Sequence, residues 1–255
     1  TYIQNHNNGS NLTVYFPPGT YKITRTLTIV HVAGVSFIGC GSGTKISWAG
    51  PSGGALYWPQ GVDNMRYIGL TWLGNNLAAA AYEECSYQVY SGGLHHENES
   101  FHDFTAKANY PYQDQNGKMI TTPTPPTSAI ISGYPAGLTG ETQIFNCAFI
   151  NCGAGVAEEW NIGNYFCWFI EGCEFENCGV GVNLYTGGGN AIESCHFDHC
   201  TVADVLGGGD TRVRHCTSEG GNYFYADPGS DGNPLDSDVV EDCRIDGWSK
   251  PDYAI

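Results

Sequence analysis

Three observations predict that this chain folds as an all-β parallel β-helix, a solenoid in which similar rungs stack in register. The phrase C-x-F-x-[NH]-C occurs three times, starting at Cys147, Cys173 and Cys195. The copies lie about 22 to 26 residues apart, a period typical of solenoids with one short strand pattern per repeat. The residues around them alternate with period two, which is the period of a strand and not of a helix.

Each repeat is expected to place its cysteines inside. Cys and Phe stand two residues apart, so on a strand their side chains point to the same face. The pattern predicts two inward stacks, one of Cys147, Cys173, Cys195 and Cys216 and one of Cys152, Cys178 and Cys200. After Cys178, the alternation predicts that Val180, Val182 and Leu184 face inward and that Gly179, Gly181, Asn183 and Tyr185 face outward.

Asn151 and Asn177 precede the second Cys of their repeats and are expected to stack at one corner of the solenoid. Asparagine suits such a corner because its side chain bonds backbone groups that the bend leaves free. The sequence therefore predicts a structural role for both residues.

The N-terminal part carries an independent pattern. Val14-Tyr-Phe-Pro-Pro-Gly-Thr-Tyr21 is followed by Gly34-Val-Ser-Phe-Ile-Gly-Cys-Gly-Ser-Gly-Thr44. A strand-turn-strand with a later glycine-rich turn resembles the opening rungs of the pectin-lyase-like superfamily. The resemblance covers nearly the whole chain at the level of rung pattern and implies a right-handed, single-stranded parallel β-helix. It implies no single activity, because this fold carries hydrolases, lyases, epimerases, adhesins and inert fibres.

A single domain over residues 1–255 is expected, because no linker or composition break divides the chain. Between about residues 106 and 140, proline-rich sequence interrupts the rung pattern and predicts a long loop insertion. The insertion either walls a groove with a binding site beside it or is a surface loop without such a role. The first residues indicate the tail of a helix that caps the first rung, and the last residues form no polar cap. The sequence is therefore expected to be a piece of a longer chain, with homo-oligomers or end-to-end stacking open.

The composition bears on partners and location. The chain has 26 Asp and Glu against 10 Lys and Arg, a net charge of −16, so we expect no binding of nucleic acid. No apolar stretch is long enough for insertion into a membrane. Sequons at Asn8, Asn11 and Asn98 are compatible with a secreted or cell-surface protein.

The chain has 11 cysteines, and their odd number and ladder positions argue against a disulfide framework. Stacked cysteines on a parallel sheet lie about 4.8 Å apart, but their parallel Cβ directions oppose the disulfide torsion. Most are predicted to be buried free thiols. For Cys40 and Cys85, a disulfide bridge with a neighbouring cysteine is the alternative.

Four acidic residues are predicted to be catalytic: Glu158, Glu159, Asp204 and Asp210. Rung alignment gives Asp204 the slot of Val182, so either a bulge turns it outward or it is a buried acid with a raised pKa. Residues that break a local pattern are candidates for function. The four lie on consecutive rungs along one edge, where carboxyl separations of about 5 to 10 Å suit glycoside hydrolysis. Acids that satisfy turn amides or lie solvated at a rim are the alternative.

Substrate binding is predicted for residues close to these acids, namely Trp160, Asn183, Tyr185 and Arg212. An aromatic face stacks well on the apolar face of a sugar ring. Core packing is the alternative role of the tryptophan.

No metal site and no cofactor are predicted. The stretch from His95 to Asp103 is rich in metal-ligand types but matches no spacing of a metal motif. Calcium stays open at the acid-rich and glycine-rich stretch 227–236, which lacks the closing Glu of an EF-hand.

The predicted function is that of a secreted, carbohydrate-active glycoside hydrolase that degrades a polysaccharide with paired carboxylates. The alternative, from a different class, is a non-catalytic β-helix that serves as an adhesin, fibre subunit or glycan-binding scaffold. A polysaccharide lyase is the third option, since elimination usually employs Lys, Arg or Ca²⁺ and only Arg212 and Arg214 lie near the acids. The chain lacks the Asn-Thr-Asp, Asp-Asp and Arg-Ile-Lys signatures of polygalacturonases and the Asp-Pro-His-Asp of alginate epimerases.

Overall fold

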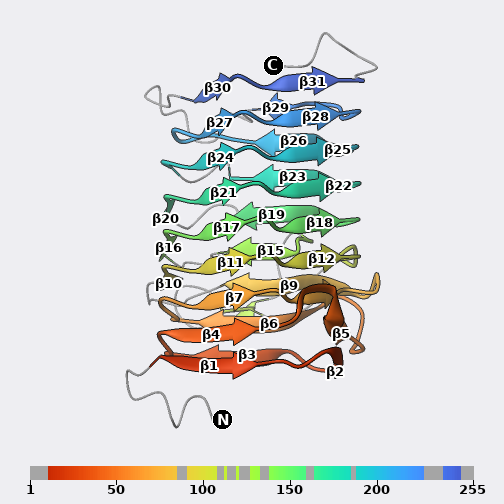
Figure 1. The fold of residues 1–255 in the computed structure, drawn as a ribbon, viewed down its shortest axis with the longest axis vertical. Helices are drawn as coiled ribbons and strands as arrows, with labels where there is room; N and C mark the ends of the chain where they lie inside the picture. The colour runs from red at the N-terminus through yellow and green to blue at the C-terminus, as the bar shows by residue number, and fades with distance from the viewer. Residues whose placement is uncertain are drawn as a thin grey trace.

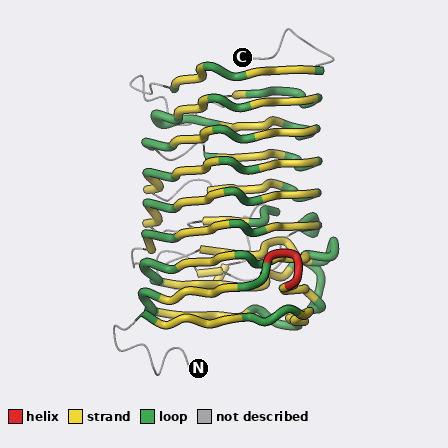
Figure 2. Tube along the Cα trace, in the orientation of Figure 1, coloured by secondary structure: helices red, strands yellow, loops and turns green. Residues whose placement is uncertain are grey.

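The protein is a right-handed parallel β-helix, as the sequence predicts, and its short strands stack into three long sheets (Figure 1). The computed structural model describes residues 11–84, 91–107, 112–113, 119–120, 127–132, 138–158, 164–184, 188–226 and 238–247. Apart from one 3-10 turn, η1 (Gly41–Gly43), the elements assigned in these residues are strands (Figure 2).

The long sheets, which we name A, B and C, each take one strand from nearly every rung. Sheet A contains β1 (Leu12–Tyr15), β4 (Val35–Ile38), β7 (Arg66–Ile68), β11 (His95–Glu97), β17 (Gln143–Phe145), β21 (Phe169–Glu171), β24 (Ala191–Glu193), β27 (Arg212–Arg214) and β30 (Val239–Glu241). Sheet B contains β2 (Gly19–Ile23), β5 (Thr44–Trp48), β8 (Thr71–Leu73), β12 (Ser100–His102), β18 (Ala148–Ile150), β22 (Glu174–Glu176), β25 (His196–Asp198), β28 (Thr217–Glu219) and β31 (Arg244–Asp246). Sheet C contains β3 (Leu27–Val30), β6 (Gly54–Gln60), β9 (Ala78–Glu84), β15 (Ile130–Ser132), β19 (Ala154–Glu158), β23 (Val180–Asn183), β26 (Ala203–Leu206) and β29 (Tyr225–Ala226).

Two small sheets complete the described strands. A three-stranded parallel sheet, sheet D, precedes sheet A in the middle rungs and consists of β10 (Ser91–Gly92), β16 (Leu138–Gly140) and β20 (Asn164–Phe166). An antiparallel pair of β13 (Tyr112–Gln113) and β14 (Met119–Ile120) lies within the predicted insertion. Strand β15 already belongs to sheet C, so the interruption of the rung pattern ends before Ile130.

The corners of the solenoid depend on residues in the left-handed backbone region. Asn151 and Asn177 bend the chain between sheets B and C with φ of 55° and 53°, which asparagine tolerates better than most residues. Their structural role is confirmed, but their hydrogen bonds differ from the prediction. Asn151 Nδ2 donates to Asp103 Oδ1 at 2.6 Å, and Asn177 Nδ2 donates to Glu176 Oε1 at 3.2 Å, so the partners are carboxylates and not backbone groups.

The core follows the repeated phrase. Every member of the two predicted cysteine stacks is at most 3% exposed. The phenylalanines between them form a ladder with ring centroids 4.9 Å apart, and the ladder consists of Phe101, Phe149, Phe175 and Phe197. The ten cysteines that the structure describes are free, while Cys85 lies outside the described residues.

Sheet C departs from simple alternation, and this corrects the predicted inward track. Gly181 and Val182 are both buried, while Val180 packs against Ala154 and Ala157 in a cluster apart from the main core. The reason is steric, because a Cβ on Gly181 would lie 2.7 Å from the ring of Phe197. The Phe ladder therefore requires glycine at this position, and the next residue, Val182, is buried as well.

Candidate functional site

The outward face of sheet A carries the aromatic and acidic side chains of the central rungs. Strand alternation puts the first and third residue of each short strand outside. The first positions of β11, β17 and β21 are His95, Gln143 and Phe169, which pair in register. The third positions of β11, β17, β21 and β24 are Glu97, Phe145, Glu171 and Glu193. The main-chain register thus aligns these side chains in two columns.

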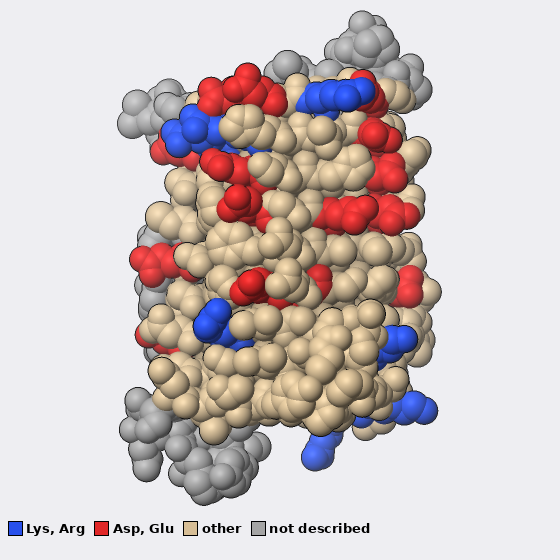
Figure 3. Space-filling model, in the orientation of Figure 1, with Lys and Arg blue, Asp and Glu red and all other residues tan. Residues whose placement is uncertain are grey.

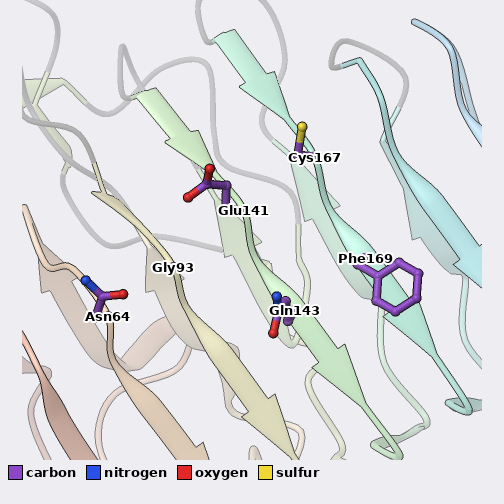
Figure 4. Close-up of a pocket in the computed structure, with 6 residues that line it drawn as sticks. All are labelled: Asn64, Gly93, Glu141, Gln143, Cys167 and Phe169. Atoms are coloured by element: carbon purple, nitrogen blue, oxygen red, sulfur yellow. The ribbon is translucent and has the colours of Figure 1, made fainter.

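A pocket of about 510 Å³ opens where this face meets the corner that precedes sheet A. Figure 4 shows its lining side chains coming from neighbouring rungs, and they are Asn64, Gly93, Glu141, Gln143, Cys167 and Phe169. Four of them occupy the same corner position of successive rungs, with φ between 50° and 61°. Glycine and asparagine tolerate this backbone region, whereas Glu141 and Cys167 adopt it at a cost in energy. The corner therefore places a carboxylate and a thiol side by side at the pocket.

An aromatic cluster adjoins the pocket. The Phe145 ring centroid lies 5.3 Å from that of His95 and 5.5 Å from that of Phe169. His95 is fixed by both ring nitrogens, since Nδ1 lies 3.2 Å from Gln143 Oε1 and Nε2 lies 3.1 Å from Glu97 Oε2. The three rings are only partly buried, so they present apolar area to solvent. Such a surface suits the apolar face of a sugar ring.

Two carboxylates oppose each other beside the aromatic cluster. Glu171 of β21 and Glu193 of β24 are direct partners in the parallel register, and both are partly buried. Neighbouring strands lie about 4.8 Å apart, so the two side chains leave the sheet close together. Like charges directly opposite each other on a sheet destabilise it. The next position of this column is Arg214, which pairs with Glu241.

The structure separates the acids that the sequence grouped along one edge. Asp204 lies inside the solenoid at 0% exposure, so it does not contact a surface groove. Its register is level with Gly181 and not with Val182, because Val182 pairs with Val205. Ser218 stands in the phenylalanine column at this rung, and this smaller side chain leaves space for the carboxyl.

Burial raises the pKa of Asp204 to about 7, and hydrogen bonds from the Ser218 hydroxyl and the Cys200 thiol oppose this shift. Of the two alternatives that the sequence left open for Asp204, an outward bulge and a buried acid with a raised pKa, the structure has the buried acid. The residue is a structural acid in the core, since substrate cannot reach it.

The remaining predicted residues fall on different faces. Glu158 ends β19 and Asn183 ends β23, both in sheet C, and Asn183 Oδ1 is buried without a hydrogen bond in the described part of the chain. Asp210 occupies the corner position before sheet A, and Arg212 is the first residue of β27. These two residues therefore share the face of the pocket, two rungs beyond Cys167 and Phe169.

Three predicted site residues, Glu159, Trp160 and Tyr185, lie outside the described residues, as does the calcium candidate 227–236. Within the described residues, no group of three or more His, Cys, Asp or Glu side chains could hold a metal ion. No helix in the same residues is long and apolar enough to cross a membrane.

Sequence reasoning missed the outward residues of sheet A. The triplets Gln143-Ile-Phe145, Phe169-Ile-Glu171 and Ala191-Ile-Glu193 share a buried central isoleucine. Aligning those isoleucines would have brought Phe145, Glu171 and Glu193 into one outward column. The C-x-F-x-[NH]-C phrase is more regular, and its alignment identifies the strands of sheet B, which follow those of sheet A along the chain.

Comparison with solved structures finds a shared fold, at low sequence identity, in a viral protein. ORF18 of Geobacillus virus E2 gives a TM-score of 0.51 at 15% identity, over 98% of this chain and 54% of that chain. This chain thus spans about half the length of that protein. A pectin methylesterase in complex with hexasaccharide VII gives a TM-score of 0.44 at 11% identity, over 95% and 86% of the two chains. The A-module of the Azotobacter vinelandii mannuronan C-5 epimerase AlgE6 gives 0.27 at 14% identity, over 96% and 92%.

Sequence comparison adds one partial match. The family model described as Adenovirus EB1 55K protein / large t-antigen matches residues 133–226, less than half of the chain. No curated protein matches the sequence. The fold, a right-handed parallel β-helix, is the one that the resemblance of the opening rungs implied.

Proposed function

We propose that the protein binds a polysaccharide along the outward face of sheet A and hydrolyses it there with Glu171 and Glu193. The observation that carries the proposal is the partly exposed aromatic cluster next to two opposed carboxylates. Phe145 and Phe169 form the sugar platform, while His95, Gln143 and the pocket side chains supply hydrogen bonds.

The carboxylate arrangement supports a retaining mechanism. Retaining glycosidases hold two carboxyl groups about 5 to 5.5 Å apart, and side chains that leave in-register strands about 4.8 Å apart are able to adopt this spacing. One glutamate attacks the anomeric carbon while the other protonates the departing glycosidic oxygen. The second glutamate then removes a proton from water, which displaces the covalent intermediate. A functional role also accounts for two like charges that would otherwise only weaken the sheet.

Two of the site residues predicted from the sequence belong to this proposal. Asp210 and Arg212 extend the binding face toward the C-terminal rungs. Glu158, Glu159, Trp160 and Tyr185 stay predictions from the sequence. Location outside the cell, where polysaccharides are met, belongs to the same proposal.

The proposal is tested with a panel of plant, algal and fungal polysaccharides, assayed for new reducing ends. We expect Glu171→Gln and Glu193→Gln each to lower turnover by about a hundredfold or more, since acid–base catalysis contributes that much. Binding of an uncharged glycan should change little in both variants. The control is Glu219→Gln, an exposed residue on sheet B, which should leave turnover unchanged. Unchanged turnover in both sheet A variants would reject these residues as catalysts.

A non-catalytic adhesin, fibre subunit or glycan-binding scaffold is the second candidate. The long unbroken stacks of sheets A and B favour it, because a rigid rod with an aromatic stripe needs no catalytic group to hold a glycan. Glycan binding that depends on Phe145 and Phe169, without reducing ends or unsaturated products, would select this function. Unsaturated products that absorb in the ultraviolet would select the third option, a polysaccharide lyase.

A further inference from the structure

Charge is distributed unevenly along the solenoid. None of the 26 Asp and Glu residues falls in the first 62 residues, which contain Lys22, Arg25 and Lys45. The central and C-terminal rungs therefore hold the negative charge. Figure 3 shows acidic side chains gathered over the upper part of the face, with Lys and Arg mainly at its lowest and uppermost rungs. The proposed site lies within the acidic part.

The carboxylates of the site are placed to meet a ligand. Glu97, Glu171 and Glu193 flank Phe145 in its own outward column, and Glu141 lines the adjoining pocket. Basic side chains pair with acidic residues at the two ends of this column, and Glu171 and Glu193 lie between these ends. Arg66 Nη2 lies 3.9 Å from Glu97 Oε2, and Arg214 pairs with Glu241 at the far end of the column.

An anionic polysaccharide would meet repulsion on this face. A uronate chain lying across Phe145 and Phe169 would place its carboxylates next to Glu171 and Glu193. Repulsion between like charges at such a distance weakens binding of an anionic polysaccharide, while attraction between opposite charges strengthens binding of a cationic one. Ammonium groups would also gain from the faces of the two phenylalanine rings.

Resting on the proposed function, we propose that the substrate is a cationic amino-sugar polysaccharide, with free amines that pair with the glutamates of sheet A. The apolar faces of its sugars stack on Phe145 and Phe169, and ammonium groups lie against Glu171 and Glu193. Solvent screens these pairs, since the Debye length is about 8 Å at physiological ionic strength. Salt therefore weakens the preference for the amino sugar more than it weakens the aromatic contact.

The test compares three oligosaccharides of equal length by calorimetry: fully deacetylated glucosamine, N-acetylglucosamine and galacturonate oligomers. At low salt we expect the glucosamine oligomer to bind about tenfold or more tightly than the acetylated one, and the galacturonate oligomer to bind weakest. In 0.5 M salt this preference should fall severalfold. Equal or tighter binding of the neutral or anionic oligomer would overturn the inference and leave the proposed function standing. No binding of any glycan would overturn both.

Substitutions on sheet A test whether the binding preference for the amino sugar arises there. The double change Glu171→Gln and Glu193→Gln should abolish most of the preference for the amino sugar while keeping binding of the acetylated oligomer. Phe169→Ala should weaken binding of both oligomers alike. The control, Glu219→Gln with Asp246→Asn, removes the same charge from sheet B and should keep the preference. An equal loss of the preference in the control would show that the preference depends on the overall charge of the protein, and it would overturn the location of the site on sheet A.

Discussion

The N-terminal and C-terminal rungs fill the interior of the same solenoid in two ways. In the later rungs, Phe149, Phe175 and Phe197 repeat in register and stack with interplanar angles of 5° and 9°. In the earlier rungs, the stacked column mixes Phe37, Tyr67 and His96, with interplanar angles of 7° and 19°. Rings from different sheets meet it edge to face, such as Tyr82 against Tyr67 at 60°. Identical residues in register produce a periodic core, whereas mixed residues produce a core whose contacts are all different.

One position shows the difference directly. Glu99 occupies the corner slot that Cys147 and Cys173 hold in later rungs, because the residues that follow them pair in register. A thiol there is a small, weakly polar side chain that bonds a backbone carbonyl. A buried carboxylate at 2% exposure needs stronger partners. It has three, Trp72 Nε1 at 2.8 Å, Tyr82 OH at 2.9 Å and His96 Nδ1 at 2.8 Å.

The comparison teaches where the solenoid is vulnerable. The cysteine rungs depend on packed volume, while the Glu99 rung depends on completing a buried network. Burial next to Glu99 raises the pKa of the Tyr82 hydroxyl well above its usual value, so this proton stays in the network.

The largest expected effect breaks this network. We expect Glu99→Ala to lower the free energy of unfolding by about 5 kcal/mol, because the change strands three buried groups at once. Urea unfolding followed by circular dichroism measures the loss. The exposed Glu219→Ala is the matched control and should change stability by less than about 0.5 kcal/mol. A loss below about 1 kcal/mol for Glu99→Ala would contradict the account.

The periodic core should respond to lost volume. Phe175 is fully buried between the rings of Phe149 and Phe197, each 4.9 Å away, so Phe175→Ala should cost about 4 kcal/mol. Phe145→Ala, the same change on the outward face, should cost less than half as much. The same unfolding measurement compares them. Equal losses would show that the ladder adds nothing beyond general hydrophobic contact.

The sequence predicted the periodic half better than the mixed half, for a physical reason. The Cys and Phe residues that recur at the positions of Cys147 and Phe149 show both the period and the inward face of the rungs. Identical residues at a fixed spacing can be recognised without knowing which other residues they contact. The role of Glu99 depends on Trp72 and Tyr82, which lie in other rungs and show no shared pattern. The candidate site has the same difficulty, because Phe145, Glu171 and Glu193 become neighbours only through the register.

The third prediction concerns pH. The folded protein holds the pKa of Asp204 at about 7, above the ordinary 3.8, so this group's contribution is fully present below about pH 4 and is lost as pH rises through 7. Three pKa units correspond to up to about 4 kcal/mol. Asp204→Asn removes the titration, so the stability of the variant minus that of the unmodified protein should rise from pH 4 to pH 8. Unfolding at several pH values measures it.

The exposed Asp63→Asn is the matched control and should show no comparable trend. A difference between Asp204→Asn and the unmodified protein that stays constant with pH would mean that Asp204 is ionised inside the folded protein. Ser218, whose hydroxyl donates to Asp204, would then have to hold a buried carboxylate with little other support.

The smallest effect tests why the Phe ladder imposes glycine on sheet C. A Cβ at position 181 would lie 2.7 Å from the Phe197 ring and 2.6 Å from the Asp204 carbonyl oxygen, so Gly181→Ala should cost about 2 kcal/mol. Gly43→Ala is the control, since its Cβ would have no neighbour nearer than 3.7 Å. Chemical denaturation again provides the comparison. If Gly181→Ala costs no more than Gly43→Ala, the Phe197 ring and the Asp204 backbone move aside readily, and the Phe ladder does not require glycine at this position.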